Sequence, residues 1–355
     1  MKQAGHPAPV VVIGGCGFIG SNLADSLMSD GRYVRVVDNL SRPGVEQNLA
    51  WLRQRHPEKL TVDIVDIRGL EAVKAAVSGA EAVFHLAAQT AVTTSLGNPV
   101  EDFEINARGT LNVLEATRAA GAKIPVIFAS TNKVYGALCE LETGLLGQCH
   151  LPLDATLRSR GIDESWPLDF STPYGCSKGV ADQYVLDYAK SYDMRTAVLR
   201  MSCIYGPRQF GCEDQGWVAH FLIRALERQP ITVFGDGAQV RDILHVSDAV
   251  AAYRALLANI DHVRGKAFNL GGGPRNAVSL NQVLSAIADL TGRRPDIRLA
   301  EPRTGDQRYF VADTGRLQEA VGWRAGTGWR QGLETLAKWI ARGRGGDAVH
   351  QKFVA

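Results

Sequence analysis

The sequence predicts an α/β fold: a doubly wound parallel sheet followed by a smaller mixed α/β domain. Three observations predict it. Short runs rich in β-branched residues alternate with longer helical patterns through the first half of the chain. A glycine-rich turn follows the first of these runs, and an aspartate ends the second run and the third. Such alternation implies parallel strands joined by right-handed crossovers.

The elements of the first half follow in order from this pattern. We expect strands at 10–13, 34–37, 60–65, 82–86 and 126–129, with helices at 21–29, 70–78 and 109–120 between them. Residues 137–160 break the alternation without a clear period. We expect them to form a long loop over a functional site, which is a common role for long irregular loops.

The second half begins with a long helix. We expect that helix at 173–191, a strand at 196–199, further helices at 217–228, 247–257 and 280–290, and a frayed tail at 342–355. A chain of 355 residues suggests two domains. We assign residues 1–200 to the first domain, to which part of 235–262 returns, and residues 201–345 to the second.

Composition excludes several classes of protein. The net charge of +2 gives no electrostatic reason to expect nucleic acid or an anionic membrane as a partner. The six cysteines contain no C-x-x-C pair, so we expect reduced thiols, no metal site and a cytoplasmic location. The first apolar run, at 10–13, is too short for a signal peptide or a membrane span.

A dinucleotide-binding motif follows the first strand. It satisfies G-x-x-G-x-x-G with Gly14, Gly17 and Gly20, and its helix opens with Phe18 and Ile19. The glycines let the backbone approach a pyrophosphate, which then rests on the helix N-terminus. A glycine-rich turn without a ligand is the alternative.

The ends of the later strands extend this site. Asp38, beside Asn39, ends the second strand, where a carboxylate accepts hydrogen bonds from a ribose diol and repels a 2′-phosphate. NAD is therefore preferred, although Arg42 keeps NADP as a minor alternative. Asp66 and Ile67 could flank the adenine. Leu86 ends the fourth strand, and the small residues that follow it, namely Ala87 and Ala88, leave room for the cofactor. By composition these positions could equally be ordinary strand ends.

Tyr174 and Lys178 are the candidate catalytic pair. They are four residues apart, so they share one face of the predicted helix. A nearby ammonium favours the phenolate, which would make Tyr174 a general base for an alcohol. Thr131 follows a strand at the carboxyl edge of the sheet and can hydrogen-bond the reacting hydroxyl. An incidental Tyr/Lys pair on a solvated helix is the alternative.

Together these motifs resemble the extended short-chain dehydrogenase/reductase family, the NAD-dependent epimerases and dehydratases that act on nucleotide sugars. The resemblance covers nearly the whole chain, including the segments 200–208, 234–237, 241–246 and 303–308. It implies a Rossmann fold, NAD as cofactor, and proton and hydride chemistry by Tyr174, Lys178 and Thr131. It also implies that Arg241 and Arg308 hold a nucleotide diphosphate, and that helices around 111–118 and 174–188 form a homodimer or homotetramer.

Two residues after Thr131 select among the branches of this family. Dehydratases carry an Asp-Glu pair where this chain has Asn132 and Lys133, and decarboxylating members usually carry Glu at the second position. The segments 130–136, 171–179, 208–210, 214–218, 239–242 and 306–308, with the insertion 137–160, resemble the CDP-paratose 2-epimerase (CDP-tyvelose epimerase) branch instead.

That branch implies an isomerase that inverts C2 of a CDP-deoxyhexose through a transient 2-keto sugar. The residues implied to bind the nucleotide-diphosphate sugar are Thr131, Asn132, Lys133, Arg208, Gln209, Arg241 and Arg308. Another epimerase, acting on a UDP-sugar or at C4, is the alternative, and a non-catalytic NAD-binding regulator is a weaker one. Cys203 replaces an asparagine typical of many 4-epimerases and leaves that phosphate contact unassigned. The sequence does not identify the base, the sugar or the direction of reaction.

Overall fold

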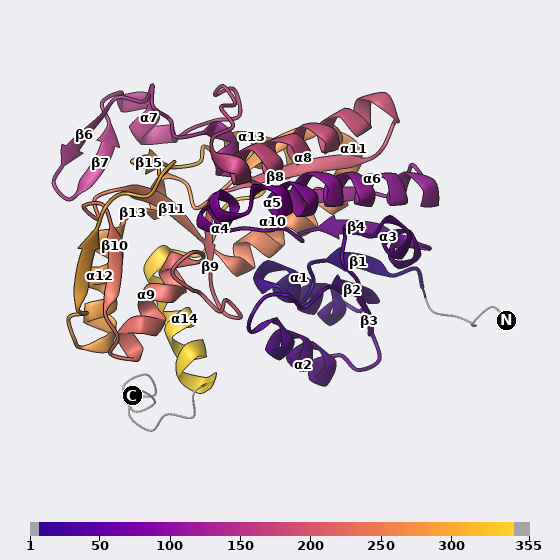
Figure 1. The fold of residues 1–355 in the computed structure, drawn as a ribbon, viewed down its shortest axis with the longest axis horizontal. Coiled ribbons are helices and arrows are strands. Elements are labelled where there is room, and N and C mark those ends of the chain that lie inside the picture. Colours follow the sequence, from indigo (N-terminus) through magenta and orange to yellow (C-terminus); the bar gives the residue numbers. More distant parts are fainter. Residues whose placement is uncertain (1–6, 344–355) are drawn as a thin grey trace.

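A seven-stranded parallel sheet forms the centre of the molecule (Figure 1), in the order β12-β8-β5-β4-β1-β2-β3. We describe residues 7–343 of a computed structural model. The strands are β1 (Val10–Ile13), β2 (Val34–Asp38), β3 (Leu60–Ile64), β4 (Ala82–His85), β5 (Val126–Thr131), β8 (Thr196–Met201) and β12 (Lys266–Leu270). The predicted doubly wound α/β fold is confirmed, and each of the five strands expected in the first half begins at the expected residue.

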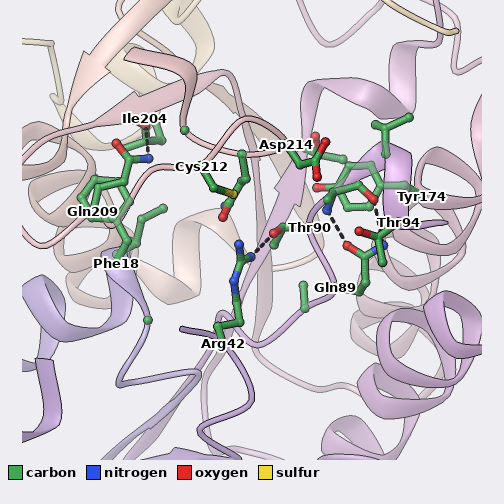
Figure 2. Close-up of a pocket in the computed structure, with 18 of the residues that line it drawn as sticks. Phe18, Arg42, Gln89, Thr90, Thr94, Tyr174, Ile204, Gln209, Cys212 and Asp214 are labelled. Atoms are coloured by element: carbon green, nitrogen blue, oxygen red, sulfur yellow. Dashed lines mark hydrogen bonds between the residues drawn. The ribbon is translucent and has the colours of Figure 1, made fainter. Parts of the chain in front are cut away.

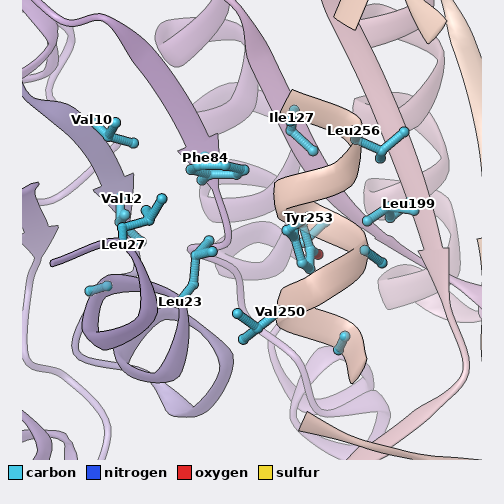
Figure 3. Close-up of a cluster of buried hydrophobic side chains, with 14 of the residues drawn as sticks. Val10, Val12, Leu23, Leu27, Phe84, Ile127, Leu199, Val250, Tyr253 and Leu256 are labelled. Carbon is cyan, nitrogen blue, oxygen red and sulfur yellow. The ribbon is translucent and has the colours of Figure 1, made fainter. Parts of the chain in front are cut away.

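Helices cover both faces of this sheet, which is why the inner strands β1, β4 and β5 are buried along their whole length. One face carries α1 (Phe18–Ser29), α2 (Val45–Arg55) and α10 (Val246–Ala258). The other carries α3 (Leu70–Val77), α6 (Gly109–Ala120) and α8 (Thr172–Ser191). Figure 3 shows Tyr253 and Val250 of α10 beside Leu23 of α1, over the buried strand residues Val12 and Phe84.

The polypeptide re-enters the first half after leaving it. Helix α10 packs against α1, and β12 pairs with β8, so residues 246–270 complete the central sheet and its cover. Short elements connect the layers: α4 (Val92–Gly97), α5 (Pro99–Phe103), a π-helix η1 (Glu104–Arg108), a 3-10 helix η2 (Asn132–Tyr135) and α11 (Ile260–Val263). Helices α4 and α5 both pack on α8.

Three strands surround β11 (Val240–His245) in the second half. They are β9 (Cys203–Tyr205), β13 (Ala277–Ser279) and β15 (Tyr309–Phe310). A separate pair joins β10 (Ile231–Phe234) to β14 (Ile297–Ala300). Around them lie α9 (Trp217–Leu226), the 3-10 helix η3 (Pro274–Asn276), α12 (Leu280–Thr291), α13 (Gly315–Val321) and α14 (Trp329–Gly343). Among residues 7–343, no helix has the length and apolar composition needed to cross a membrane.

The insertion at 137–160 is not the irregular loop expected from the sequence. It forms a hairpin of β6 (Thr143–Leu146) and β7 (Cys149–Pro152), followed by α7 (Ala155–Arg160). Gly147, with φ of 63°, permits the tight turn between the strands. Strand β7 packs on β11, β13 and β15, away from the main cavity, because its Leu151 joins a small apolar cluster there. The tail expected at 342–355 lies outside the described residues from 344 onward, and α14 extends to Gly343.

Candidate active site

A cavity of about 1090 Å³ lies at the carboxyl ends of β1 and β4, where the strand order reverses. Ligands of doubly wound sheets bind at this position. Both halves of the chain line the cavity, and all but two of the predicted site residues are among the lining residues. The exceptions are Lys178 and Arg308. Figure 2 shows Phe18 and Gln209 on one side, Tyr174 and Thr94 on the other, and Arg42 reaching Thr90 between them.

The glycine motif is a cradle that side chains would fill. A Cβ on Gly14, whose φ is 79°, would lie 2.6 Å from the backbone nitrogen of Ala87. A Cβ on Gly20 would lie 2.2 Å from the carbonyl oxygen of Gly14. Helix α1 begins at Phe18, so its free N–H groups face the cavity, where a pyrophosphate would be stabilised.

Carboxylates at the ends of β2 and β3 complete this half of the cavity. Asp38 accepts hydrogen bonds from the backbone of Cys16 (3.0 Å) and Leu40 (2.9 Å), and burial raises its pKa. The hydrogen bonds and charge of Arg68 hold the pKa of Asp66 at about 2. Asn39 donates to Asp66 at 3.2 Å and so joins the two strand ends. A glycine cradle next to an acceptor for a ribose diol fits a dinucleotide.

Tyr174 enters the cavity from the first turn of α8. Pro173 occupies the start of that helix, which suits its fixed φ, and the backbone nitrogen of Tyr174 donates to Ser95 at 3.1 Å. Burial raises the pKa of Tyr174 to about 12, whereas a hydrogen bond with Thr131 and the charge of Arg42 lower it. Tyr174 and Thr131 are therefore brought together as predicted, on one wall of the cavity.

Lys178 lies directly behind this wall. Its Nζ donates to the carbonyl oxygen of Ala129 at 2.7 Å and lies 4.1 Å from the ring centroid of Phe128. Burial lowers its pKa to about 7, while Asp182 and Asp102 oppose that shift. The side chain does not line the cavity, so its effect on the pKa of Tyr174 and its contact with a cofactor stay predictions.

Cations and amides from the end of β5 and from the second half of the chain line another part of the cavity. Arg241 donates to Asp306 at 2.6 Å, and Lys133 donates to the carbonyl oxygen of Gly305 at 3.0 Å. Burial and the charge of Arg241 lower the pKa of Lys133 to about 8. Asn132 donates to Gln307 at 3.1 Å, which ties the end of β5 to the segment before β15.

Arg308 is the predicted substrate-binding residue that does not line the cavity. Its neighbours Gln307 and Tyr309 are buried, so the alternation of an extended segment leaves Arg308 exposed. Arg303 lines the cavity instead, with its guanidinium carbon 3.9 Å from the ring centroid of Phe234. The alternation of apolar and polar residues after Asp306 was the signal that could have distinguished the two arginines.

Arg208 and Gln209 lie where the two halves meet. The guanidinium carbon of Arg208 lies 3.9 Å from the ring centroid of Trp51, and its φ is 73°. Gln209 is buried and donates to the carbonyl oxygen of Ile204 at 3.2 Å, while its own amide oxygen has no partner. Cys203 accepts from the indole nitrogen of Trp217 at 3.4 Å.

The fold and this cavity define a class of protein: an enzyme that binds a dinucleotide at the switch point of a doubly wound sheet and places a tyrosine beside it. A family model described as "NAD dependent epimerase/dehydratase family" matches residues 10–271. The chain belongs to that family. It is an NAD-dependent nucleotide-sugar epimerase, as predicted.

Two relatives match over almost their whole length. The chain is 41% identical to a CDP-paratose 2-epimerase of Salmonella typhi over 339 residues, which cover 94% of this chain and 99% of the relative. A putative UDP-glucose 4-epimerase of Methanocaldococcus jannaschii is 30% identical, with 93% and 98% covered.

Solved structures of epimerases also match this chain over almost its whole length. A UDP-glucose 4-epimerase of Thermotoga maritima with UDP-glucose has a TM-score of 0.80 and 30% identity, covering 94% of this chain and 99% of that one. A UDP-glucose 4-epimerase of Thermus thermophilus in complex with NAD has a TM-score of 0.78 and 32% identity, covering 95% and 99%.

Proposed function

We propose that this enzyme inverts C2 of a CDP-deoxyhexose, interconverting CDP-paratose and CDP-tyvelose through a transient 2-keto sugar. The observation that carries this choice of substrate is the 41% identity to a CDP-paratose 2-epimerase over 94% of the chain. The paired Thr131 and Tyr174 in the cavity support the chemistry, and Asn132 and Lys133 provide no carboxylate for dehydration.

In this proposal Tyr174 takes the proton of the C2 hydroxyl and Thr131 orients that oxygen. NAD, when bound, would supply the reversible hydride transfer at C2 and a positive charge that favours the phenolate, and Tyr174 would return the proton when the C2 hydroxyl forms again. Lys178, held against Ala129, supports the phenolate from behind. Gly14, Gly17, Gly20 and Asp38 would hold the cofactor.

The wall that contains Arg241, Lys133 and Arg303 would hold the substrate while its hexose turns over. Inversion requires firm contacts to the diphosphate and loose ones to the sugar. Arg241 and Lys133 supply positive charge, and Arg303 takes the role that the family resemblance implied for Arg308. Planar guanidinium groups suit a diphosphate because they donate two hydrogen bonds in a fixed geometry.

Proton NMR of the purified enzyme in deuterated water tests this function, with CDP-paratose in one tube and UDP-glucose in another. We expect the C2 epimer of CDP-paratose to appear without deuterium at C2, because the hydride returns from the cofactor. Deuterium at C2 would contradict the hydride scheme. Conversion of UDP-glucose alone would mean that the enzyme is a UDP-sugar epimerase, which the relatives at about 30% identity would then explain.

We also propose a homodimer or homotetramer that assembles through α6 and α8. Tyr184, within α8, and Tyr192, the residue that follows it, are 43% and 45% exposed, and such aromatic residues suit an interface. Light scattering after size-exclusion chromatography would measure the mass, and a monomer would contradict this assembly.

A cytoplasmic location is proposed because all six cysteines are free thiols.

A further inference from the structure

Asp102 is a buried carboxylate behind the catalytic pair, and the proposed function does not use it. It lies on α5, which packs against α8, and its side chain is fully buried. The hydroxyl of Ser177 donates to one of its oxygens, and Asn106 donates to the other at 3.2 Å. Ser177 precedes Lys178 in the sequence, and its hydroxyl lies 3.2 Å from the carbonyl oxygen of Tyr174.

The buried charges around α8 give Asp102 a partner. Arg200 and Asp182 neutralise each other through two hydrogen bonds of 3.0 and 2.9 Å, and both are buried. Lys178 then has one other carboxylate acting on it, Asp102. Burial raises the pKa of Asp102, while the hydrogen bond from Ser177 and the charge of Lys178 favour its ionised form. A buried ammonium needs such a counter-charge, because desolvation otherwise favours its neutral form. His85, the other ionisable group near Lys178, is held neutral because burial lowers its pKa to about 3.

We propose that Asp102 is a positioning residue for the epimerase: it fixes Ser177 between Tyr174 and Lys178 and supplies the negative charge that balances Lys178. This inference rests on the proposed function for its meaning in catalysis. The hydrogen bonds of Asp102 do not depend on which nucleotide sugar is bound, since Asp102 does not line the cavity.

The charge of Asp102 acts on both catalytic groups in one direction. It raises the pKa of Lys178, because it stabilises the ammonium, and it raises the pKa of Tyr174, because it opposes a second negative charge. The other charged groups that face the pair are Asp182 toward Lys178 and Arg42 toward Tyr174. Removing the charge of Asp102 alone should therefore move both macroscopic pKa values of the pair downward.

Asp102→Asn removes this charge and can keep every hydrogen bond. The new amide would accept from Asn106 and donate to Ser177, whose hydroxyl would turn to the carbonyl oxygen of Tyr174 that it already approaches. We expect both limbs of the pH–rate profile to move to lower pH by about one unit. A residue needed only for folding would lower the rate without moving the limbs.

Glu104→Gln is the matched control. It removes one negative charge two residues away, but Glu104 pairs with Arg108 at the surface, so the limbs should stay in place. If Asp102→Asn does not fold, Ser177→Ala carries the test. This variant removes the hydroxyl whose hydrogen bond favours the ionised form of Asp102. Both limbs of the pH–rate profile should therefore move to lower pH, by less than in Asp102→Asn. Unmoved limbs in a folded variant would overturn the proposal.

A second readout separates this inference from the proposed function. The ultraviolet absorbance of tyrosinate, taken as the difference between the NAD-loaded enzyme and its Tyr174→Phe variant, reports the ionisation of Tyr174 without substrate. We expect this titration to shift to lower pH in Asp102→Asn. If CDP-paratose is untouched but the titration shifts, the substrate assignment fails and the role of Asp102 stands. If CDP-paratose reacts but nothing shifts, the role of Asp102 is refuted.

Discussion

The two walls of the cavity are placed by different rules of strand pairing. On the cofactor wall, the glycine motif, Asp38 and Asp66 lie at the carboxyl ends of strands of one parallel sheet, so they meet at the same edge of that sheet. On the substrate wall, β11 pairs with three strands that lie far from it in the chain. The first wall therefore follows from the carboxyl ends of parallel strands, which the sequence marks, and the second from pairings of mixed direction that no short motif records.

Loss of the phenol should have the largest effect and should leave the cofactor wall intact. We expect Tyr174→Phe to lower the rate of epimerisation about a thousandfold, because positioned acid–base groups contribute on this scale. NAD should remain bound, since the glycine cradle is unchanged. Initial rates by NMR, with NAD released by denaturation and quantified, test both parts. Tyr33→Phe, outside the cavity and outside the helices of the proposed interface, is the control, and equal losses in the two variants would contradict the role of Tyr174.

A single added methyl group on the cofactor wall should weaken NAD binding. In Gly14→Ala the new Cβ meets the backbone of Ala87 at 2.6 Å, and a φ of 79° costs an alanine about 1–2 kcal/mol. We expect NAD binding to weaken at least about tenfold, measured by calorimetry. Gly31→Ala separates the two causes, because φ there is 89° but nothing lies within 4 Å of the new Cβ. Equal NAD affinity in both variants would mean that close approach is unimportant.

The same contrast explains what could be predicted from the sequence. Every predicted residue of the glycine motif and of the later strand ends lines the cavity. The reason is that parallel strands all end at the same edge of the sheet, so a residue that ends a strand lies at that edge. Arg308 does not line the cavity because buried Gln307 and Tyr309 take the inward side of this extended segment, and its role in binding stays a prediction. The hairpin at 143–152 was missed because a two-residue turn at Gly147 and packing on β11 order a segment without clear periodicity.

Arg303 and Arg308 provide a direct comparison within the substrate wall. We expect Arg303→Ala to raise KM for the nucleotide sugar about tenfold with little change in kcat, because the lost contact is with the part of the substrate that does not react. Arg308→Ala should change KM less than about twofold, since the side chain is exposed and outside the cavity. Steady-state kinetics measure both, and the reverse order would restore the original assignment of Arg308.

Lys133 offers a smaller effect whose sign can be worked out. Burial and Arg241 lower its pKa to about 8, so its ammonium is lost as pH rises above that value. If it faces the diphosphate, KM should rise a few-fold between pH 8 and 10, and Lys133→Arg should remove that rise because guanidinium keeps its charge. Over this range the unfolded chain still binds the proton that the folded enzyme has released, so this residue's contribution to stability increases with pH. Substrate binding and stability should therefore change in opposite directions, and a parallel loss of both would mean that alkaline unfolding, not Lys133, explains the kinetics.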